Sequence, residues 1–206
     1  MAQLHVQGVS KHFGGVAAVD GLDMSVEQGE LRGLIGPNGA GKTTLFNVIS
    51  GLYSPSAGTI MFEGREIAGK RPSAVARCGL VRTFQRDAIF HELDVLRNVT
   101  TARHLHVREG PLRSVFGRAR KYRQQQEAHA REILAFVGLD HQRDEIAANL
   151  PHGQQRLLGI AMALAAEPRF LMLDEPVTGM NPTEAEGMVH LIRKIRDDWG
   201  TTVLLV

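Results

Sequence analysis

The spacing of hydrophobic positions changes several times along this chain, and each change predicts a different element. Over residues 1–30, apolar residues alternate with polar ones between glycine-containing breaks, a period of two that predicts short antiparallel strands. Residues 31–36 form a compact apolar run that ends in glycine and predicts a further strand. From Lys42 the spacing becomes helical, and Gly51 lies near the expected end of that helix. Its predicted apolar side consists of Leu45, Val48, Ile49 and Leu52.

The chain changes character between about residues 87 and 149. Before this segment, residues 58–67 predict two strands joined by a Glu-Gly turn, and a brief helix precedes a strand at 80–84. The segment itself is rich in Arg, Gln, Glu and Ala, and residues 122–139 have the spacing of an amphipathic helix that Gly138 ends. We therefore expect a helical subdomain inserted into an α/β core.

The alternation of helices and strands then resumes. Residues 153–167 predict a buried helix that stops before a proline. The next run shows no alternation across Phe170–Leu173, which predicts a strand buried on both faces. In the following helix we expect Asn181 as the N-cap, Pro182 at the first helical position and Glu184 in a capping box. The last six residues, "TTVLLV", predict a final strand.

Composition and charge exclude several classes of protein. A chain of 206 residues, 43% of them hydrophobic, suffices for one packed domain, or one domain with a subdomain. The net charge of +2 is too small to indicate an electrostatic partner by itself, and the most basic stretch, residues 113–131, is either a solvated helix face or a patch for nucleic acid or anionic lipid. The single cysteine, Cys78, excludes an intrachain disulfide. The longest apolar run, residues 157–166, is far shorter than the roughly 20 residues that a membrane span needs.

The stretch "GPNGAGKTT" carries the most specific chemistry in the sequence. It matches G-x-x-x-x-G-K-[ST] between a predicted strand and a predicted helix, the context in which this pattern binds nucleotide phosphates. Its glycines let backbone amides turn towards phosphate oxygens, and the helix start adds unpaired N–H groups. Lys42, a catalytic candidate, is expected to contact the β- and γ-phosphates, and Thr43 to ligate Mg²⁺. The expected nucleotide-binding residues here are Gly36, Pro37, Asn38, Gly39, Ala40, Gly41, Lys42, Thr43 and Thr44.

An acidic pair follows the predicted buried strand at its carboxyl end. Asp174 lies where a nucleotide-binding sheet holds an acid near Mg²⁺, and Glu175 is placed to act as the general base for an attacking water. Alone, such a pair is more often a helix cap or a loop, but a P-loop upstream favours catalysis. No Asn-Lys-x-Asp guanine-binding motif follows, which disfavours a GTPase, and a small-molecule kinase does not predict the Gln-Gln-Arg turn before the acidic strand.

Together these motifs resemble those of ATP-binding-cassette ATPases. "GPNGAGKTT", "RTFQ", "LPHGQQR" and "FLMLDEP" occur in the order and approximate spacing of that family, and with Phe13 and the loop "TGMN" they extend over nearly the whole chain. Within the family, the sequence is most similar to the ATPases of branched-chain and hydrophobic amino acid importers. The similarity rests on "VRTFQ", the long Arg/Gln-rich middle and a proline-bearing signature that ends in "GQQR".

The resemblance implies roles for further residues. Phe13 takes the place of the aromatic residue that stacks on adenine, with an inward-packed strand residue as the alternative. Gln85 matches the glutamine that senses Mg²⁺ and water and links the site to the membrane subunit, which makes it a candidate metal ligand and catalytic residue. Gly153 and Gln154 match the signature turn, which in this family completes the ATP site of a second subunit.

The sequence also departs from the family pattern. Pro151 replaces the signature serine and so removes a hydroxyl and an N–H group, while His152 either adds a donor or faces solvent. Because proline is tolerated in the first turn of a helix, we expect Gly153 to keep its amide available. Arg97 stands where the family often has Glu on the surface towards the membrane subunit, and residues 180–181 have Asn in place of the frequent Asp.

The family places a switch histidine just after the last strand, whereas this sequence ends at Val206. We therefore expect the chain to be truncated at its C-terminus relative to the family, and to hydrolyse ATP poorly.

The resemblance implies an α/β fold, with a RecA-like P-loop NTPase core, an N-terminal antiparallel β-subdomain and an inserted helical subdomain. We expect the first two to comprise residues 1–86 and 156–206, and the helical subdomain with the signature turn to comprise residues 87–155. The implied protein uses ATP and Mg²⁺ to energise an importer of branched-chain or other amino acids.

The implied partners are a second ATPase subunit, integral membrane permeases and, indirectly, a solute-binding protein, at the cytoplasmic face of the cell membrane. The alternative is a soluble ATPase of the same family that acts on nucleic acid or ribosomes. Such proteins usually carry tandem cassettes or a long coiled-coil insertion, and the sequence shows neither, so we expect no nucleic-acid partner.

Overall fold

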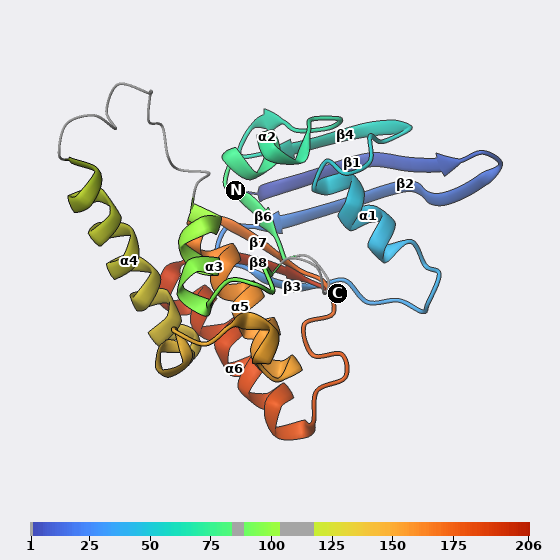
Figure 1. Cartoon of the computed structure of the whole chain (residues 1–206). Helices are drawn as coiled ribbons and strands as arrows, with labels where there is room; N and C mark the ends of the chain where they lie inside the picture. The colour runs from blue at the N-terminus through green and yellow to red at the C-terminus, as the bar shows by residue number, and fades with distance from the viewer. Residues whose placement is uncertain (1, 84–88, 104–117) are drawn as a thin grey trace. The chain divides into compact units, whose positions relative to one another are not determined.

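The computed structural model of this chain describes residues 2–83, 89–103 and 118–206 (Figure 1). Their contacts divide the chain into two compact units. Unit 1 consists of Met1–Arg82 and Pro168–Val206, and unit 2 consists of Thr83–Glu167. Unit 1 contains an antiparallel sheet and a parallel sheet with helices, which confirms the predicted α/β class.

The first part of unit 1 is an antiparallel sheet of order β2-β1-β4-β5. Its strands are β1 Ala2–Phe13, β2 Val16–Glu27, β4 Ala57–Phe62 and β5 Arg65–Glu66. β1 and β2 form one long hairpin, so the antiparallel prediction for this region is confirmed, but the strands are longer than expected. β4 and β5 pair across the predicted Glu-Gly turn, in which Glu63 and Gly64 have φ angles of 48° and 73°.

The second sheet of unit 1 is parallel, with the order β3-β8-β7-β6. Its strands are β3 Leu31–Gly33, β6 Leu80–Arg82, β7 Phe170–Leu173 and β8 Thr202–Leu205. Every residue of β7 is buried, as its unbroken apolar run predicted. Because the strands are parallel, the segments that follow β3 and β7 leave the sheet at the same edge.

Three helices complete unit 1: α1 Lys42–Ile49, α2 Pro72–Arg77 and α6 Pro182–Trp199. At the start of α6, the Asn181 side chain accepts from the Glu184 N–H at 2.9 Å, and the Glu184 carboxylate accepts from the Asn181 N–H at 3.1 Å. The predicted capping box is therefore confirmed.

The prediction for the apolar side of α1 is correct for Leu45, Val48 and Ile49, which are buried, and wrong for Leu52, which is 46% exposed. The helix ends at Ile49, and Gly51 turns the chain with a φ of 80°. Helical spacing therefore no longer applies at Leu52.

The core of unit 1 lies between α1 and strands from both sheets. Phe62 of β4 and Phe170 of β7 meet edge to face, with ring centroids 5.9 Å apart. Around them pack Leu4, Val6, Leu45, Phe46, Ile49, Ile60, Leu80, Met172 and Leu204. One shared core thus fixes α1 and β7, the two elements that carry the P-loop lysine and the acidic pair.

Unit 2 is helical, as predicted for the middle of the chain. Its helices are α3 Val95–Ala102, α4 Arg118–Val137 and α5 His152–Ala165, with 3₁₀ turns at Asp140–Gln142 and Ala147–Asn149. Gly138, with a φ of 84°, follows the end of α4 as expected. α5 packs against both α3 and α4 and therefore belongs to unit 2. The sequence predicts that the helical segment ends at about residue 155, whereas unit 2 extends to Glu167. The apolar face of a buried helix does not reveal which elements cover it, so the sequence does not show to which unit α5 belongs.

No helix in the described ranges has both the length and the apolar character that crossing a membrane requires.

Candidate functional site

Two glycines shape the loop between β3 and α1. Gly39 and Gly41 have φ angles of 83° and 80°, a region that glycine adopts without strain. A Cβ on Gly41 would stand 2.1 Å from the carbonyl oxygen of Ala18 on β2. The loop therefore passes so close to the neighbouring strand that no side chain fits at position 41, directly before the lysine of the motif.

Lys42 is the first residue of α1, and its ammonium group bonds back onto the loop. Nζ donates to the carbonyl oxygens of Gly36 at 2.7 Å and Pro37 at 2.8 Å. The Ala40 N–H donates to the same Pro37 carbonyl at 3.2 Å. These bonds curl the loop around the lysine. Since an ammonium group has three N–H donors, the third is left for an anion.

The start of α1 adds backbone donors. Gly41 is its N-cap, no side chain caps the helix there, and its first turn contains no acidic residue. Thr43 is exposed and Thr44 is half-buried. The first N–H groups of a helix have no intrahelical acceptor and carry partial positive charge, so this end suits a phosphate group.

Asp174, directly after β7, is a buried acid. Its side chain is 1% exposed, and Oδ2 accepts from Nη2 of Arg82 on β6 at 2.6 Å. Oδ1 is also buried, and no described residue bonds to it. Because a buried polar atom without a partner costs free energy, Oδ1 is a candidate ligand atom.

Glu175 follows Asp174 but lies in a different environment. It is exposed, and its φ of 46° is rare for a residue other than glycine. The Glu175 N–H donates to the Val206 carbonyl at 3.1 Å, and Oε2 accepts from the Thr178 hydroxyl at 3.2 Å. This turn separates the two acids, so that one is buried beside an arginine and the other can contact water.

The structure brings the P-loop and the acidic pair to the same sheet edge, on either side of β8 (Figure 1). The N–H of Leu34, at the start of the P-loop segment, donates to the Leu205 carbonyl at 2.8 Å. Glu175 bonds to the next residue, Val206, so both segments are tied to the end of β8. These residues, predicted from motifs far apart in the sequence, thus form one site.

Phe13, at the end of β1, is 45% exposed, which excludes the alternative of an inward-packed strand residue. Its ring meets Tyr53 edge to face at 5.3 Å, and Nζ of Lys11 lies 5.1 Å from its centroid. Sequence reasoning missed Tyr53 and Lys11, because only the fold brings the end of α1 beside the first hairpin.

The predicted signature turn lies in unit 2, at the start of α5. Pro151 is the N-cap, with φ −54° and ψ 150°, and His152 is the first helical residue. We had expected Pro151 within the first turn, so this position is corrected by one residue. Its extended backbone precedes the helix, and its carbonyl accepts from the Gln155 N–H at 3.0 Å.

Gly153 and Gln154 occupy the first turn of α5, as predicted. No side chain caps this helix, so the fold leaves its first N–H groups without a side-chain acceptor. The Gln154 side-chain oxygen accepts from Nε2 of Gln142 at 2.8 Å, which engages that side chain inside unit 2.

The remaining predicted residues either lie outside the described residues or make local contacts on their own helix. Gln85 lies outside the described residues, as does part of the basic stretch at 113–131. Arg97 is exposed and pairs with Asp94 on its own helix at 3.2 Å. Asn181 is engaged in the capping box of α6.

Arg82 was missed as a site residue, although a lone arginine in the apolar run "GLVRTF" was a signal that could have found it.

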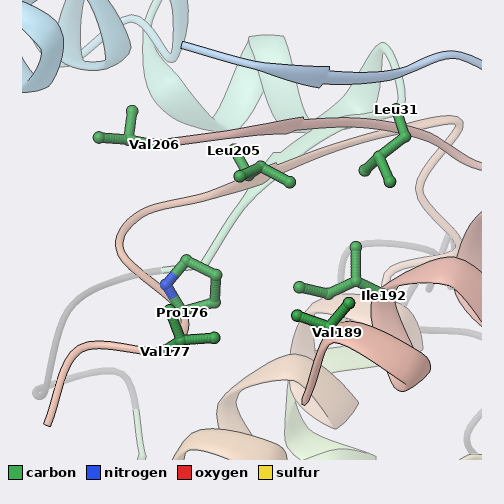
Figure 2. A pocket seen from close by; sticks show the side chains of 7 residues that line it. All are labelled: Leu31, Pro176, Val177, Val189, Ile192, Leu205 and Val206. Carbon is green, nitrogen blue, oxygen red and sulfur yellow. The ribbon is translucent and has the colours of Figure 1, made fainter. Parts of the chain in front are cut away.

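Unit 1 also contains an apolar hollow of about 130 Å³ (Figure 2). It is lined by Leu31, Pro176, Val177, Val189, Ile192, Leu205 and Val206. None of these side chains is charged or carries a hydrogen-bonding group, so the lining of this hollow offers nothing that would bind a phosphate.

Known proteins share both the sequence and the fold. An ABC transporter family model matches residues 19–178. The high-affinity branched-chain amino acid transport ATP-binding protein BraF of Pseudomonas aeruginosa is 41% identical over 205 residues, which cover 98% of this chain and 80% of BraF. The probable branched-chain amino acid transport ATP-binding protein LivG of Archaeoglobus fulgidus is 37% identical over 206 residues, with 100% and 79% covered.

Solved structures agree. A nucleotide-free ATP-binding cassette from an ABC transporter aligns with a TM-score of 0.84 at 33% identity and covers 100% of this chain and 81% of its own. A further structure, of an ATP-binding cassette of an ABC transporter in its ADP conformation, aligns with a TM-score of 0.85 at 34% identity, with 100% and 80% covered. The chain therefore belongs to the ABC transporter family and is one of its ATP-binding cassette ATPase domains.

Proposed function

We propose that this ATPase energises an importer of branched-chain or other amino acids. The observation that carries the proposal is the placement of the P-loop and the acidic pair on either side of β8 at one sheet edge. The solute class is supported by the relatives BraF and LivG, which are described as branched-chain amino acid transport ATP-binding proteins.

In this proposal, the P-loop binds the phosphates of ATP. The backbone N–H groups at the uncapped start of α1 and the third donor of Lys42 face the β- and γ-phosphates, while the exposed ring of Phe13 stacks on adenine. The loop is already curled around the lysine, so little ordering free energy is spent on forming the phosphate site.

The residues at this edge fit Mg²⁺. Oδ1 of Asp174 is buried and has no partner among the described residues, and with the hydroxyl of Thr43 it is an oxygen ligand of the kind that Mg²⁺ prefers. We propose both as ligands, with Gln85 as a third. When bound, the ion neutralises charge that develops on the phosphate oxygens.

Glu175 is the proposed general base. One of its oxygens accepts a single bond from Thr178, so the exposed carboxylate can hold a water molecule and take its proton. The water oxygen then bonds to the γ-phosphorus as the bond between the γ-phosphorus and the bridging oxygen breaks, which leaves ADP and inorganic phosphate.

We further propose that two such subunits act together. The first-turn N–H groups of α5 at Gly153 and Gln154 would contact the nucleotide of a second subunit. Since the Gln154 side chain is engaged by Gln142, its backbone is the expected contact. Integral membrane permeases at the cytoplasmic face, and indirectly a solute-binding protein, are the remaining partners.

Leucine uptake tests the transport role. In cells whose importer contains this protein, Asp174→Asn is expected to lower uptake of radiolabelled leucine more than tenfold, because the loss of a charged metal ligand removes several kcal/mol of transition-state stabilisation. Asp198→Asn, at an exposed position of α6, is the matched control and should leave uptake unchanged.

Unchanged leucine uptake in Asp174→Asn cells, with ATP hydrolysis lost in the purified variant, would contradict the proposed solute class. It would still agree with the assignment of the chain as an ATPase. Co-sedimentation of the wild type with ribosomes, and not with membranes, would favour the soluble alternative.

A further inference from the structure

Arg82 is the buried cation of the candidate site. Its side chain is 8% exposed, at the end of β6, which lies beside β7 in the parallel sheet (Figure 1). Nη2 donates to Oδ2 of Asp174 at 2.6 Å, and Nη1 donates to Oδ1 of Asn47 on α1 at 2.5 Å. Nη1 also lies 3.4 Å from the Ser50 hydroxyl, and the guanidinium carbon lies 5.6 Å from the centre of the Phe46 ring. One side chain thus connects β6, β7 and α1.

Arg82 divides its guanidinium nitrogens between Asp174 and Asn47, so it does not bind both oxygens of the Asp174 carboxylate. Arginine often binds both oxygens of a carboxylate with two parallel bonds. Here Nη2 binds only Oδ2 and Nη1 is engaged by Asn47, while Nε of Arg82 and Oδ1 of Asp174 are buried and have no hydrogen-bond partner among the described residues. The arginine therefore sets the orientation of the carboxylate and leaves one buried oxygen available.

The same contact fixes the distance between the acid and the P-loop helix. Asn47 and Ser50 are on the helix that begins with Lys42 and Thr43, and Phe46 of that helix lies in the shared core. Because Arg82 is nearly inaccessible to water, its charge is screened less than that of a surface arginine, and its two bonds hold their partners more firmly.

We propose that Arg82 is a positioning residue for the metal site. It ties Asp174 to α1 so that Oδ1 of Asp174 and the hydroxyl of Thr43 are held ready for one Mg²⁺ ion. The inference rests on the proposed Mg²⁺-dependent function, and it assigns to Arg82 a role that acts through Asp174 and not on the nucleotide.

Binding of a fluorescent, non-hydrolysable ATP analogue, titrated with Mg²⁺, tests this role without any turnover. Arg82→Met is expected to weaken the affinity for Mg²⁺ by about tenfold or more, the usual effect of removing a residue that orients a metal ligand. Analogue binding without Mg²⁺ should stay unchanged, since the P-loop is intact. Arg82→Lys should recover part of the loss, because it keeps the charge but lacks the fork that reaches Asn47.

Arg82→Met also leaves a buried carboxylate without its cation, which can lower stability. Asn47→Ala provides the second test, because it removes the α1 anchor and keeps the ion pair. It should weaken Mg²⁺ affinity in the same direction and by less. Arg77→Met, an exposed arginine on α2, is the matched control and should change nothing.

Wild-type Mg²⁺ affinity in Asn47→Ala, or in a folded Arg82→Met protein, overturns the positioning role. A wild type whose analogue binding does not respond to Mg²⁺ contradicts the proposed metal site itself, so failure of the inference and failure of the function can be told apart.

Discussion

Asp174 and Glu175 are adjacent acids that the fold prepares for different tasks. Asp174 directly follows a buried strand and keeps one oxygen beside Arg82, whereas Glu175 turns outward with a positive φ. Such a backbone conformation costs about 1 kcal/mol or more, so the surrounding bonds must hold it. The bond from the Glu175 N–H to the end of β8 is one of these.

Lys42 is the residue on which phosphate binding should depend most directly. Lys42→Ala removes a charge-assisted bond of about 1.5–3 kcal/mol, so we expect ATP affinity to fall roughly tenfold to a hundredfold. It also removes the two bonds that curl the loop. Equilibrium binding of a fluorescent ATP analogue measures the change, with the exposed Lys70→Ala as control. Equal affinity in wild type and Lys42→Ala would count against the P-loop assignment.

Motifs identified the phosphate loop and the acids from sequence because their chemistry lies in consecutive residues. Arg82 could not be assigned in this way, since its partner Asp174 is reached only when β6 pairs with β7. Tyr53 beside Phe13 was missed for the same reason: sequence shows neighbours along the chain and not across it.

At the scale of elements, the helices differ in how they begin. α6 starts with the Asn181–Glu184 capping box, which supplies acceptors to the N–H groups of Asn181 and Glu184. α1 and α5 start without a side-chain cap, at Gly41 and Pro151. Their first N–H groups have no side-chain acceptor, and these are the donors that the proposed function assigns to phosphate.

Asn181→Ala tests the structural side of this difference. The substitution should lower the free energy of unfolding by about 1 kcal/mol, because the Glu184 N–H loses its side-chain acceptor. Urea denaturation followed by circular dichroism measures it, with Thr183→Ala in the same exposed first turn as control. An unchanged midpoint in Asn181→Ala would show that the capping box does not stabilise α6.

The periodicity of hydrophobic residues predicted where helices and strands form better than it predicted which elements pack against one another. Local patterns predicted the antiparallel strand β1, the buried strand β7 and the capping box of α6, and each of these was confirmed. The unit to which α5 belongs was not predictable, because its apolar face fits any apolar surface.

At the scale of the whole molecule, two units carry complementary parts of the proposed machinery. Unit 1 holds the P-loop, the acidic pair and the buried arginine around one shared core, and unit 2 holds the signature turn. In the proposal that a second subunit completes the site, each unit supplies one helix start without a side-chain cap, α1 in unit 1 and α5 in unit 2.

We propose that Glu175 activates water for the hydrolysis of ATP bound at the P-loop. ATP turnover and ATP binding, each measured in wild type and Glu175→Gln, test this role. Glu175→Gln is expected to bind ATP with unchanged affinity and to lose at least about a hundredfold in turnover, the range expected when a general base is removed. Turnover equal to that of the wild type, with binding intact, would contradict this role.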